Sequence, residues 1–466
     1  MFAAVNAGLK GSPFRNLAPM THKFTHCLSM WPLTQVTGGS TGTEALTIGV
    51  PDDFYAVRVG FLNITASPYT INKIVAVPST TWSNYLFPTG NAAQVSITTN
   101  SAGLDDPQVA YKAGSATSLT VLANATDAMT GITDKPKVSW TDWTPCQSAT
   151  PDPTTGMRVL MLRCTVPAAQ TVTFSNGSFD GYSSGNTSPG STEINNGMEI
   201  WIGGLNSIDR SVYPYAGDSA SQASLTAWNS NRVCNGRMMA IVQVLTRNEG
   251  ICIMQAGESK YTGTSTEGQF NNFATRAVGN LNRQYLGKVP FGICNVANGG
   301  WDSAHTYGFQ REILSAISPS IVSMPSWNAN ENDLALGYTD PASQTIQWAR
   351  MLSFINAVRA VGAVPLVGSP TPFLAVGAAH PATGGTRIET LPAYAAAWAN
   401  YQALVAQGTV PTFNLSTILG LGPDRVDPHY VDSLVSTDGL HPNSLGHNKL
   451  VQPFLDAISP MLQYGS

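Results

Sequence analysis

The chain has 466 residues, of which 43% are hydrophobic and only 11% are charged. A typical soluble domain is about 25% charged, so polar uncharged residues fill the difference and favour a β-rich surface with many loops. The length suits two or three domains with cores of their own, which excludes a peptide or a mini-scaffold. The net charge is -4, with 24 Lys and Arg and no basic run, so we expect no nucleic-acid partner.

The cysteines are widely scattered, without a Cys-x-x-Cys pair or zinc-like spacing: Cys27, Cys146, Cys164, Cys234, Cys252 and Cys294. We therefore expect no metal site and no cofactor. Cys146 and Cys164 flank a turn-rich segment, where they form either one disulfide or two buried thiols.

No stretch of 18 apolar residues occurs, and the first residues lack a secretory leader pattern. We expect a soluble protein that is not inserted in a membrane. An extracellular or virion-associated location would then be reached by another route.

Up to about residue 235 the pattern is one of short strands between turns. Val57, Val59 and Phe61 alternate with Arg58 and Gly60, and similar alternation occurs within 171–175 and 198–202. Stretches rich in Gly, Ser, Thr and Asn separate the strands and predict long loops. For residues 1–235 we expect a β-sandwich or jelly-roll region that binds glycan or anchors the protein.

From residue 236 the pattern changes to strands alternating with helices. Apolar strand candidates cover residues 251–255, 289–296, 321–324, 363–367 and 410–415. Strands separated by helices predict right-handed crossovers and a parallel sheet. Residues 236–466 are thus expected to form an α/β domain of three layers, with reacting groups at the carboxyl ends of its strands.

Two connections between these strands have a helical period. The apolar face of the first, which ends at Gly362, consists of Trp348, Leu352, Ile355 and Val358. The apolar face of the second, which ends at Gly408, consists of Tyr394, Trp398, Tyr401 and Val405.

Ser259 lies just past the strand at 251–255, in the segment Gly257-Glu258-Ser259. Backbone amides at this edge of a parallel sheet can face a developing negative charge, so Ser259 is a candidate nucleophile. The alternative is that Ser259 only caps a helix.

Asp438 and His441 lie three residues apart, before a last helix expected at 445–458. A turn at Gly439 lets the carboxylate accept from one imidazole nitrogen, which leaves the other to take a proton from a serine. The alternative is that this pair caps the terminal helix.

Together these segments resemble the SGNH, or GDSL-like, serine hydrolase family over roughly residues 245–460, through four short blocks in the family's order. The blocks are Gly257-Glu258-Ser259, where Glu258 replaces the usual aspartate, then Asn295-Val296-Ala297-Asn298-Gly299-Gly300, Ser326-Trp327-Asn328-Ala329, and Asp438 with His441. The second block has Ala297 in place of the first glycine, and the third lacks its glycine and aspartate.

The resemblance implies an α/β/α esterase fold and a role for each matching residue. Ser259 would attack an ester carbonyl, His441 would remove the serine proton, and Asp438 would orient the imidazole. The oxyanion would be held by the amides of Ser259 and Gly300 and by Asn328, with Asn330 as a weaker candidate two residues away.

Other motifs favour structural roles. The segment from Gly38 to Gly42 has the Gly-x-Ser-x-Gly pattern but no strand-to-helix context, so it predicts a turn. His429 and His447 match no block, and the sequons at Asn63 and Asn176 arise easily in so polar a chain.

Aromatic residues near the second and third blocks are weak candidates for substrate binding. Trp301 and Trp327 are the main ones, and His305 and Tyr307 follow Trp301 closely. Local packing is the alternative for each of them.

Two functions remain open at this stage. The first is an esterase that removes short acyl groups, most plausibly acetyl, from a carbohydrate or another small ester. The second is a non-catalytic glycan-binding or structural phage tail protein with a decayed hydrolase domain, which the altered first and third blocks favour. The acyl group, the sugar and the oligomeric state stay open.

Overall fold

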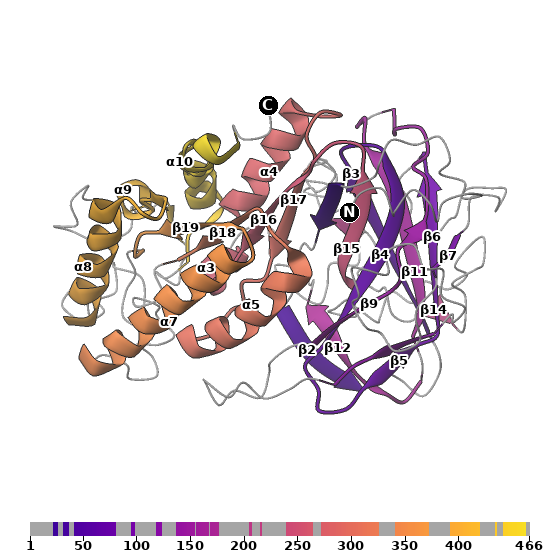
Figure 1. The fold of residues 1–466 in the computed structure, drawn as a ribbon, viewed down its shortest axis with the longest axis horizontal. Coiled ribbons are helices and arrows are strands. Elements are labelled where there is room, and N and C mark those ends of the chain that lie inside the picture. Colours follow the sequence, from indigo (N-terminus) through magenta and orange to yellow (C-terminus); the bar gives the residue numbers. More distant parts are fainter. Residues whose placement is uncertain are drawn as a thin grey trace.

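The computed structural model describes 16 stretches of the chain. They are residues 22–26, 31–36, 42–80, 95–97, 118–123, 137–153, 155–166, 168–176, 205–206, 215–216, 239–263, 272–325, 341–371, 392–419, 434–435 and 441–462. Figure 1 shows β-strands gathered on one side of the molecule and helices around a second sheet on the other. None of the helices within these stretches has both the length and the apolar composition of a membrane span.

The strand-rich side contains two larger antiparallel sheets. The first has the order β1 (His22–His26), β15 (Met239–Thr246), β4 (Phe54–Asn63) and β10 (Thr144–Pro145), with β9 (Lys137–Trp140) also paired to β4. The second has the order β13 (Leu205–Asn206), β3 (Gly42–Val50), β11 (Arg158–Val166), β6 (Lys73–Ser79) and β7 (Val95–Ile97), with β14 (Tyr215–Ala216) also paired to β3.

Two strand pairs complete this side. They are β2 (Trp31–Val36) with β12 (Thr171–Asn176), and β5 (Tyr69–Ile71) with β8 (Leu119–Val121), both antiparallel. The strand pairings described on this side are antiparallel, while its closure as a β-sandwich or jelly-roll stays a prediction.

Strand β4 is buried on both faces, although its sequence alternates. Val57 and Val59 lie in the hydrophobic core, and Arg58 on the opposite face is also buried. The Arg58 guanidinium lies 4.2 Å from the ring centroid of Trp140 and 4.8 Å from that of Trp143. Aromatic rings thus replace water around this cation.

The second side of the molecule is built on a parallel sheet. Its order is β17 (Phe291–Asn295), β16 (Ile251–Gln255), β18 (Ile321–Met324), β19 (Val364–Gly368) and β20 (Thr412–Phe413). All neighbouring strands are parallel, as predicted. From β16 the chain adds β17 on one side, and it then crosses back to add β18, β19 and β20 in turn on the other side. The direction of winding therefore reverses at β16. Ligands and reacting groups gather at the carboxyl ends of strands where such a reversal occurs.

Helices cover both faces of this sheet (Figure 1), which confirms the predicted α/β domain. On one face α4 (Phe273–Gln284) packs with α10 (Ser444–Leu462), and on the other α5 (Ser303–Ile317) packs with α7 (Pro341–Ala360), which contacts α8 (Pro392–Gln407). The short helices α3 (Ser259–Thr262) and α9 (Ser416–Leu419) follow β16 and β20. Right-handed crossovers on opposite sides of β16 place the helices on opposite faces.

The predicted apolar faces of the two long helices are confirmed in part. Trp348 is half-buried, and the side chain of Tyr394 lies outside the described residues. Leu352 in α7 and Val405 in α8 are exposed, whereas Ile355, Val358, Trp398 and Tyr401 are buried. The buried face of α7 runs instead through Met351 and Phe354, because the 3.6-residue period admits either neighbour at the edge of an apolar stripe.

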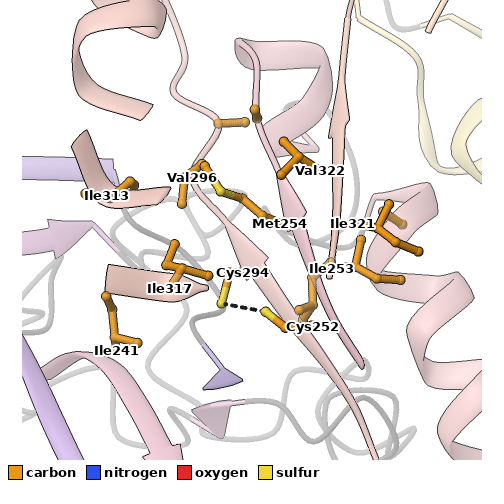
Figure 2. Close-up of a cluster of buried hydrophobic side chains, with 14 of the residues drawn as sticks. Ile241, Cys252, Ile253, Met254, Cys294, Val296, Ile313, Ile317, Ile321 and Val322 are labelled. Carbon is orange, nitrogen blue, oxygen red and sulfur yellow. Dashed lines mark hydrogen bonds between the residues drawn. The ribbon is translucent and has the colours of Figure 1, made fainter. Parts of the chain in front are cut away.

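Strand β15 starts after the predicted domain boundary at residues 235 and 236, yet it pairs with β1 and β4 of the antiparallel sheet. Figure 2 shows Ile241 of β15 in one hydrophobic cluster with Ile313 and Ile317 of α5. One continuous core therefore joins the two sides. The division into an accessory region and a hydrolase domain stays a prediction.

The four cysteines in the described residues are buried and none is in a disulfide, so Cys146 and Cys164 do not form the bridge left open above. Burial raises the pKa of the Cys146 thiol to about 12. Cys252 and Cys294 lie on neighbouring parallel strands with their sulfur atoms 3.7 Å apart, at the centre of Figure 2.

The first sequon is not an open surface site, because the Asn63 side chain is fully buried. Its amide donates to the Ser67 carbonyl at 2.9 Å, so the segment is a turn. The second sequon, at Asn176 to Ser178, extends beyond the described residues, as do the Gly-x-Ser-x-Gly segment before Gly42 and the alternation at 198–202.

Candidate active site

The segment after β16 bends sharply at Gly257, whose φ is +132°. A Cβ atom at this position would lie 2.8 Å from Cδ of Pro325, so both the backbone angle and the space require glycine. The Gln310 side chain from α5 accepts from the Gly257 amide at 3.1 Å and donates to its carbonyl at 2.9 Å. This bend places Ser259 at the first position of α3.

Ser259 and His441 meet at this carboxyl edge. His441 Nε2 lies 2.8 Å from Ser259 Oγ, although 182 residues separate them in the chain. A serine hydroxyl at hydrogen-bond distance from an imidazole nitrogen is the arrangement that general-base activation of a nucleophile requires. The pair predicted from the sequence is therefore brought together.

The turn that carries His441 is fixed from both sides. The Asn443 amide donates to the Val435 carbonyl at 3.0 Å, and Asn443 Oδ1 accepts from the Gly446 amide at 3.0 Å at the start of α10. A Cβ atom on Gly446 would lie 2.4 Å from the Leu434 carbonyl oxygen. These contacts tie the segment directly after His441 to Leu434 and Val435.

Glu258 also reaches the nucleophile. Its Oε2 accepts from the Ser259 hydroxyl at 3.0 Å and from the Lys260 amide at 2.8 Å, and the side chain is buried. From the sequence, Glu258 was only a departure from Gly-Asp-Ser with no assigned role. The extra methylene beside a candidate nucleophile is the feature that points to this contact.

The second block lies against the first. The Asn298 amide donates to the Gly257 carbonyl at 3.1 Å, and Gly300 follows with a φ of +77°, which glycine adopts without strain. Asp302 then caps α5 through the amides of Ala304 and His305. The amide of Gly300 stays a predicted oxyanion donor.

The whole third block, from Ser326 through Trp327 and Asn328 to Ala329, lies outside the described residues, and so does Asp438 of the fourth block. The weaker candidate Asn330 and the unmatched His429 lie outside as well. Their roles stay predictions.

The aromatic residues after Gly300 have partners of their own. The Trp301 ring meets Phe309 edge to face at 5.0 Å and lies 6.0 Å from His305. Tyr307 is buried and its hydroxyl accepts from Arg311 at 2.7 Å. Tyr307 is thus a packing residue, while substrate binding by Trp301 stays a prediction.

Burial and neighbouring groups shift the pKa values of two side chains near this edge. Burial raises the pKa of Asp302, but hydrogen bonds from His305 outweigh it, so the pKa ends below its usual value. Burial and then the Glu258 charge raise the pKa of the Tyr261 hydroxyl well above its usual value. Among the described residues, no group of three or more His, Cys, Asp or Glu could hold a metal ion.

His447 lies fully buried in α10, with its ring stacked on Phe273 at 6.0 Å. Burial first, and then the charges of Arg276 and His441, lower its pKa to about 3. His447 is therefore a neutral core residue, in line with the structural role expected for it.

Comparison with solved structures gives matches over less than half of the chain. The chain is similar to a GDSL-like lipase and to two esterases of known structure. It matches a GDSL-like lipase from Bacteroides thetaiotaomicron over 45% of this chain and 88% of that chain, with 17% identity and a TM-score of 0.33. It matches a family 3 carbohydrate esterase from Clostridium thermocellum over 46% of this chain and 98% of that chain, with 17% identity and a TM-score of 0.33. It also matches a catalytic mutant of an acetylxylan esterase from Geobacillus stearothermophilus over 45% of this chain and 95% of that chain, with 14% identity and a TM-score of 0.35.

Each of these matches covers less than half of this chain at 14% to 17% identity, and the resemblance to SGNH or GDSL-like hydrolases rests on the four sequence blocks. Neither a family model nor a curated protein matches the sequence.

Proposed function

We propose that the chain is a serine carboxylic ester hydrolase with Ser259 as nucleophile and His441 as general base. The observation that carries this proposal is the 2.8 Å contact between Ser259 Oγ and His441 Nε2 at the carboxyl end of β16. A helix cap needs no imidazole at the serine hydroxyl, so the capping alternative leaves this contact unexplained.

The proposed reaction has two halves. Ser259 Oγ attacks the ester carbonyl carbon while His441 Nε2 takes the hydroxyl proton, and the tetrahedral oxyanion then collapses as His441 returns the proton to the leaving alcohol. A water molecule attacks the acyl-enzyme in the same way, which releases the acid and restores Ser259. Asp438 would accept from the imidazole and hold its orientation.

The oxyanion is assigned to the amides of Ser259 and Gly300 and to the side chain of Asn328. The bend at Gly257 supports the first two, because it brings the start of α3 and the loop after β17 together through the hydrogen bond between Asn298 and Gly257. Each well-placed donor is worth about 3 to 4 kcal/mol to the transition state.

We further propose that the substrate is a carbohydrate that carries a short acyl group, most plausibly acetyl. The polar, weakly charged composition of the N-terminal region supports a glycan partner, with 11% charged residues in the chain as a whole. A short acyl group fits a chain whose sequence shows no long apolar stretch for a lipid chain.

Hydrolysis of p-nitrophenyl esters and of an acetylated polysaccharide tests both parts. We expect turnover of the acetyl ester, a steep fall with longer acyl chains, and release of acetate from the polysaccharide. Ser259→Ala should lose both activities. Activity that survives Ser259→Ala would remove the nucleophile from the proposal. Equal turnover of acetyl and octanoyl esters would remove the substrate class but leave the esterase.

A further inference from the structure

We propose that Glu258 is a positioning residue that competes with His441 for the proton of the Ser259 hydroxyl. This inference rests on the proposed esterase function, in which His441 must accept that proton. The contact arises in this chain because a glutamate stands where the resembled block has an aspartate.

The geometry places Ser259 Oγ between two acceptors. Glu258 Oε2 lies 3.0 Å away and His441 Nε2 lies 2.8 Å away, both within hydrogen-bond range. The hydroxyl has one proton and can donate to only one of them. Two arrangements of protons therefore exist at the same positions of the heavy atoms.

In the first arrangement Ser259 donates to His441, whose Nε2 carries no proton and can act as the base. In the second, Ser259 donates to Glu258, and His441 Nε2 must itself carry a proton and donate to Ser259 Oγ. Hydrogen bonds to an ionised carboxylate are about twice as strong as neutral ones. Glu258 therefore favours the form of His441 that cannot start the reaction.

Glu258 is held firmly enough to exert this effect. Its Oε2 is fixed by the Lys260 amide at 2.8 Å, and the side chain is only 3% exposed. Because little water surrounds the carboxylate, its interaction with the hydroxyl is weakly screened. An aspartate at this position would be about 1.5 Å shorter, so it could still cap α3 but would withdraw from Ser259 Oγ.

Other charged and titratable groups surround the pair. Lys260 and Tyr261 of α3 lie beside its N-cap residue Glu258, and the Glu258 charge contributes to the raised pKa of Tyr261. On the side of α4 and α10, the charges of Arg276 and His441 contribute to the lowered pKa of His447. These groups stay the same in every Glu258 variant, so a change in the acid limb reports on Glu258 itself.

Glu258→Asp and Glu258→Gln separate the effects of contact and charge. The first keeps a charged helix cap without the contact, and the second keeps the shape without the charge. In both variants we expect the acid limb of kcat/KM to move down by about one pH unit, so that the ratio of variant to parent activity rises about tenfold between pH 8 and pH 5. Thermal melting checks folding, and Glu258→Asp carries the test should Glu258→Gln be unstable.

A measurement that needs no substrate completes the design. NMR of 15N-labelled histidine, with the signal assigned through His441→Gln, follows the titration of the His441 ring in the parent, in Glu258→Gln, in Ser259→Ala and in the double variant. We expect Glu258→Gln to lower the midpoint, and we expect the shift to fall below about half its size when Ser259 is already alanine, because the hydroxyl relays the effect.

An unchanged midpoint and an unchanged acid limb in folded Glu258→Asp and Glu258→Gln would overturn the proposal and leave Glu258 as a helix cap. A shift of full size in the Ser259→Ala background would overturn the relay through Ser259. Should the parent hydrolyse no ester while the midpoint still moves, the proposed function fails and the competition for the proton stands.

Discussion

Two clusters of buried polar side chains in this molecule differ in how well they are partnered. Where the antiparallel sheet meets the end of α5, Gln243 donates to Thr25 Oγ1 at 3.0 Å and to the Ala316 carbonyl at 3.3 Å, and it accepts from Arg58 at 2.8 Å. Thr25 in turn donates to the Ile317 carbonyl at 3.3 Å. The hydrogen bonds from Gln243 and Thr25 thus satisfy carbonyl oxygens in the last turn of α5.

At the carboxyl edge of the parallel sheet the situation is the reverse. Gln255 and Ser323 lie side by side in register, and with Asn298 they are fully buried. Within the described stretches, the side-chain polar atoms of all three lack hydrogen-bond partners. Each such atom costs about 1 to 3 kcal/mol. The first region thus serves stability, whereas the second is less stable than it could be at the place where Ser259 and His441 meet.

This comparison predicts that changes at the carboxyl edge alter rates and that changes at the end of α5 alter stability. The following three variants separate effects on rate from effects on stability, from the largest expected effect to the smallest.

Asn328→Ala should lower kcat by about 100 to 1000-fold with little change in KM, because the amide is assigned to a charge that exists only in the transition state. Asn330→Ala is the matched control and should have a small effect. Steady-state kinetics with an acetyl ester measure both. A damaging Asn330→Ala beside a mild Asn328→Ala would shift the third block by two residues, and two mild variants would leave the oxyanion to backbone amides.

Gly292→Ala should destabilise the fold by about 1 to 3 kcal/mol without a matching loss of rate. A Cβ atom on Gly292 of β17 would lie 2.1 Å from the Thr25 carbonyl oxygen of β1, so the two sides of the molecule would have to move apart. Gly250→Ala is the milder control, because its Cβ atom would lie 3.1 Å from the Lys23 carbonyl oxygen. Urea unfolding gives both values, and equal stability of Gly292→Ala and the parent would show that the contact with β1 is loose.

His447→Phe should flatten the loss of stability in acid. The pKa of His447 is about 3 in the folded chain, so below about pH 6.5 only the unfolded chain binds this proton. The parent therefore loses stability as the pH falls from about 6.5 towards 3, and between pH 7 and pH 5 the loss from this residue is about 2 kcal/mol. Urea unfolding at both pH values should show a smaller difference in His447→Phe, whereas the same difference in both proteins would contradict the buried neutral ring.

Much of the α/β side could be predicted from the sequence because its signals are local. The strand at 321–324 agrees with β18 to the residue, and the helix expected at 445–458 lies within α10. Ser259 could be found because it follows a buried strand, and His441 because it precedes the last helix, each within a recognisable motif.

The contacts that join distant segments could not be predicted. β1 pairs with β15 more than 200 residues later, and neither segment carries a mark of its partner. Arg58 alternates with apolar residues as a surface residue would, yet it is buried between two tryptophans that lie far along the chain. Glu258 is one methylene longer than aspartate, and its contact with the serine hydroxyl depends on side-chain positions that the sequence does not give.

The central claim is that His441 activates Ser259, and labelling with a fluorophosphonate tests it without knowledge of the substrate. We expect one adduct per chain, located on Ser259 by peptide mapping, no labelling in Ser259→Ala, and strongly slowed labelling in His441→Gln. An unlabelled parent chain at pH 8, or an adduct on another residue, would contradict the claim and favour a structural protein with an inactive hydrolase fold.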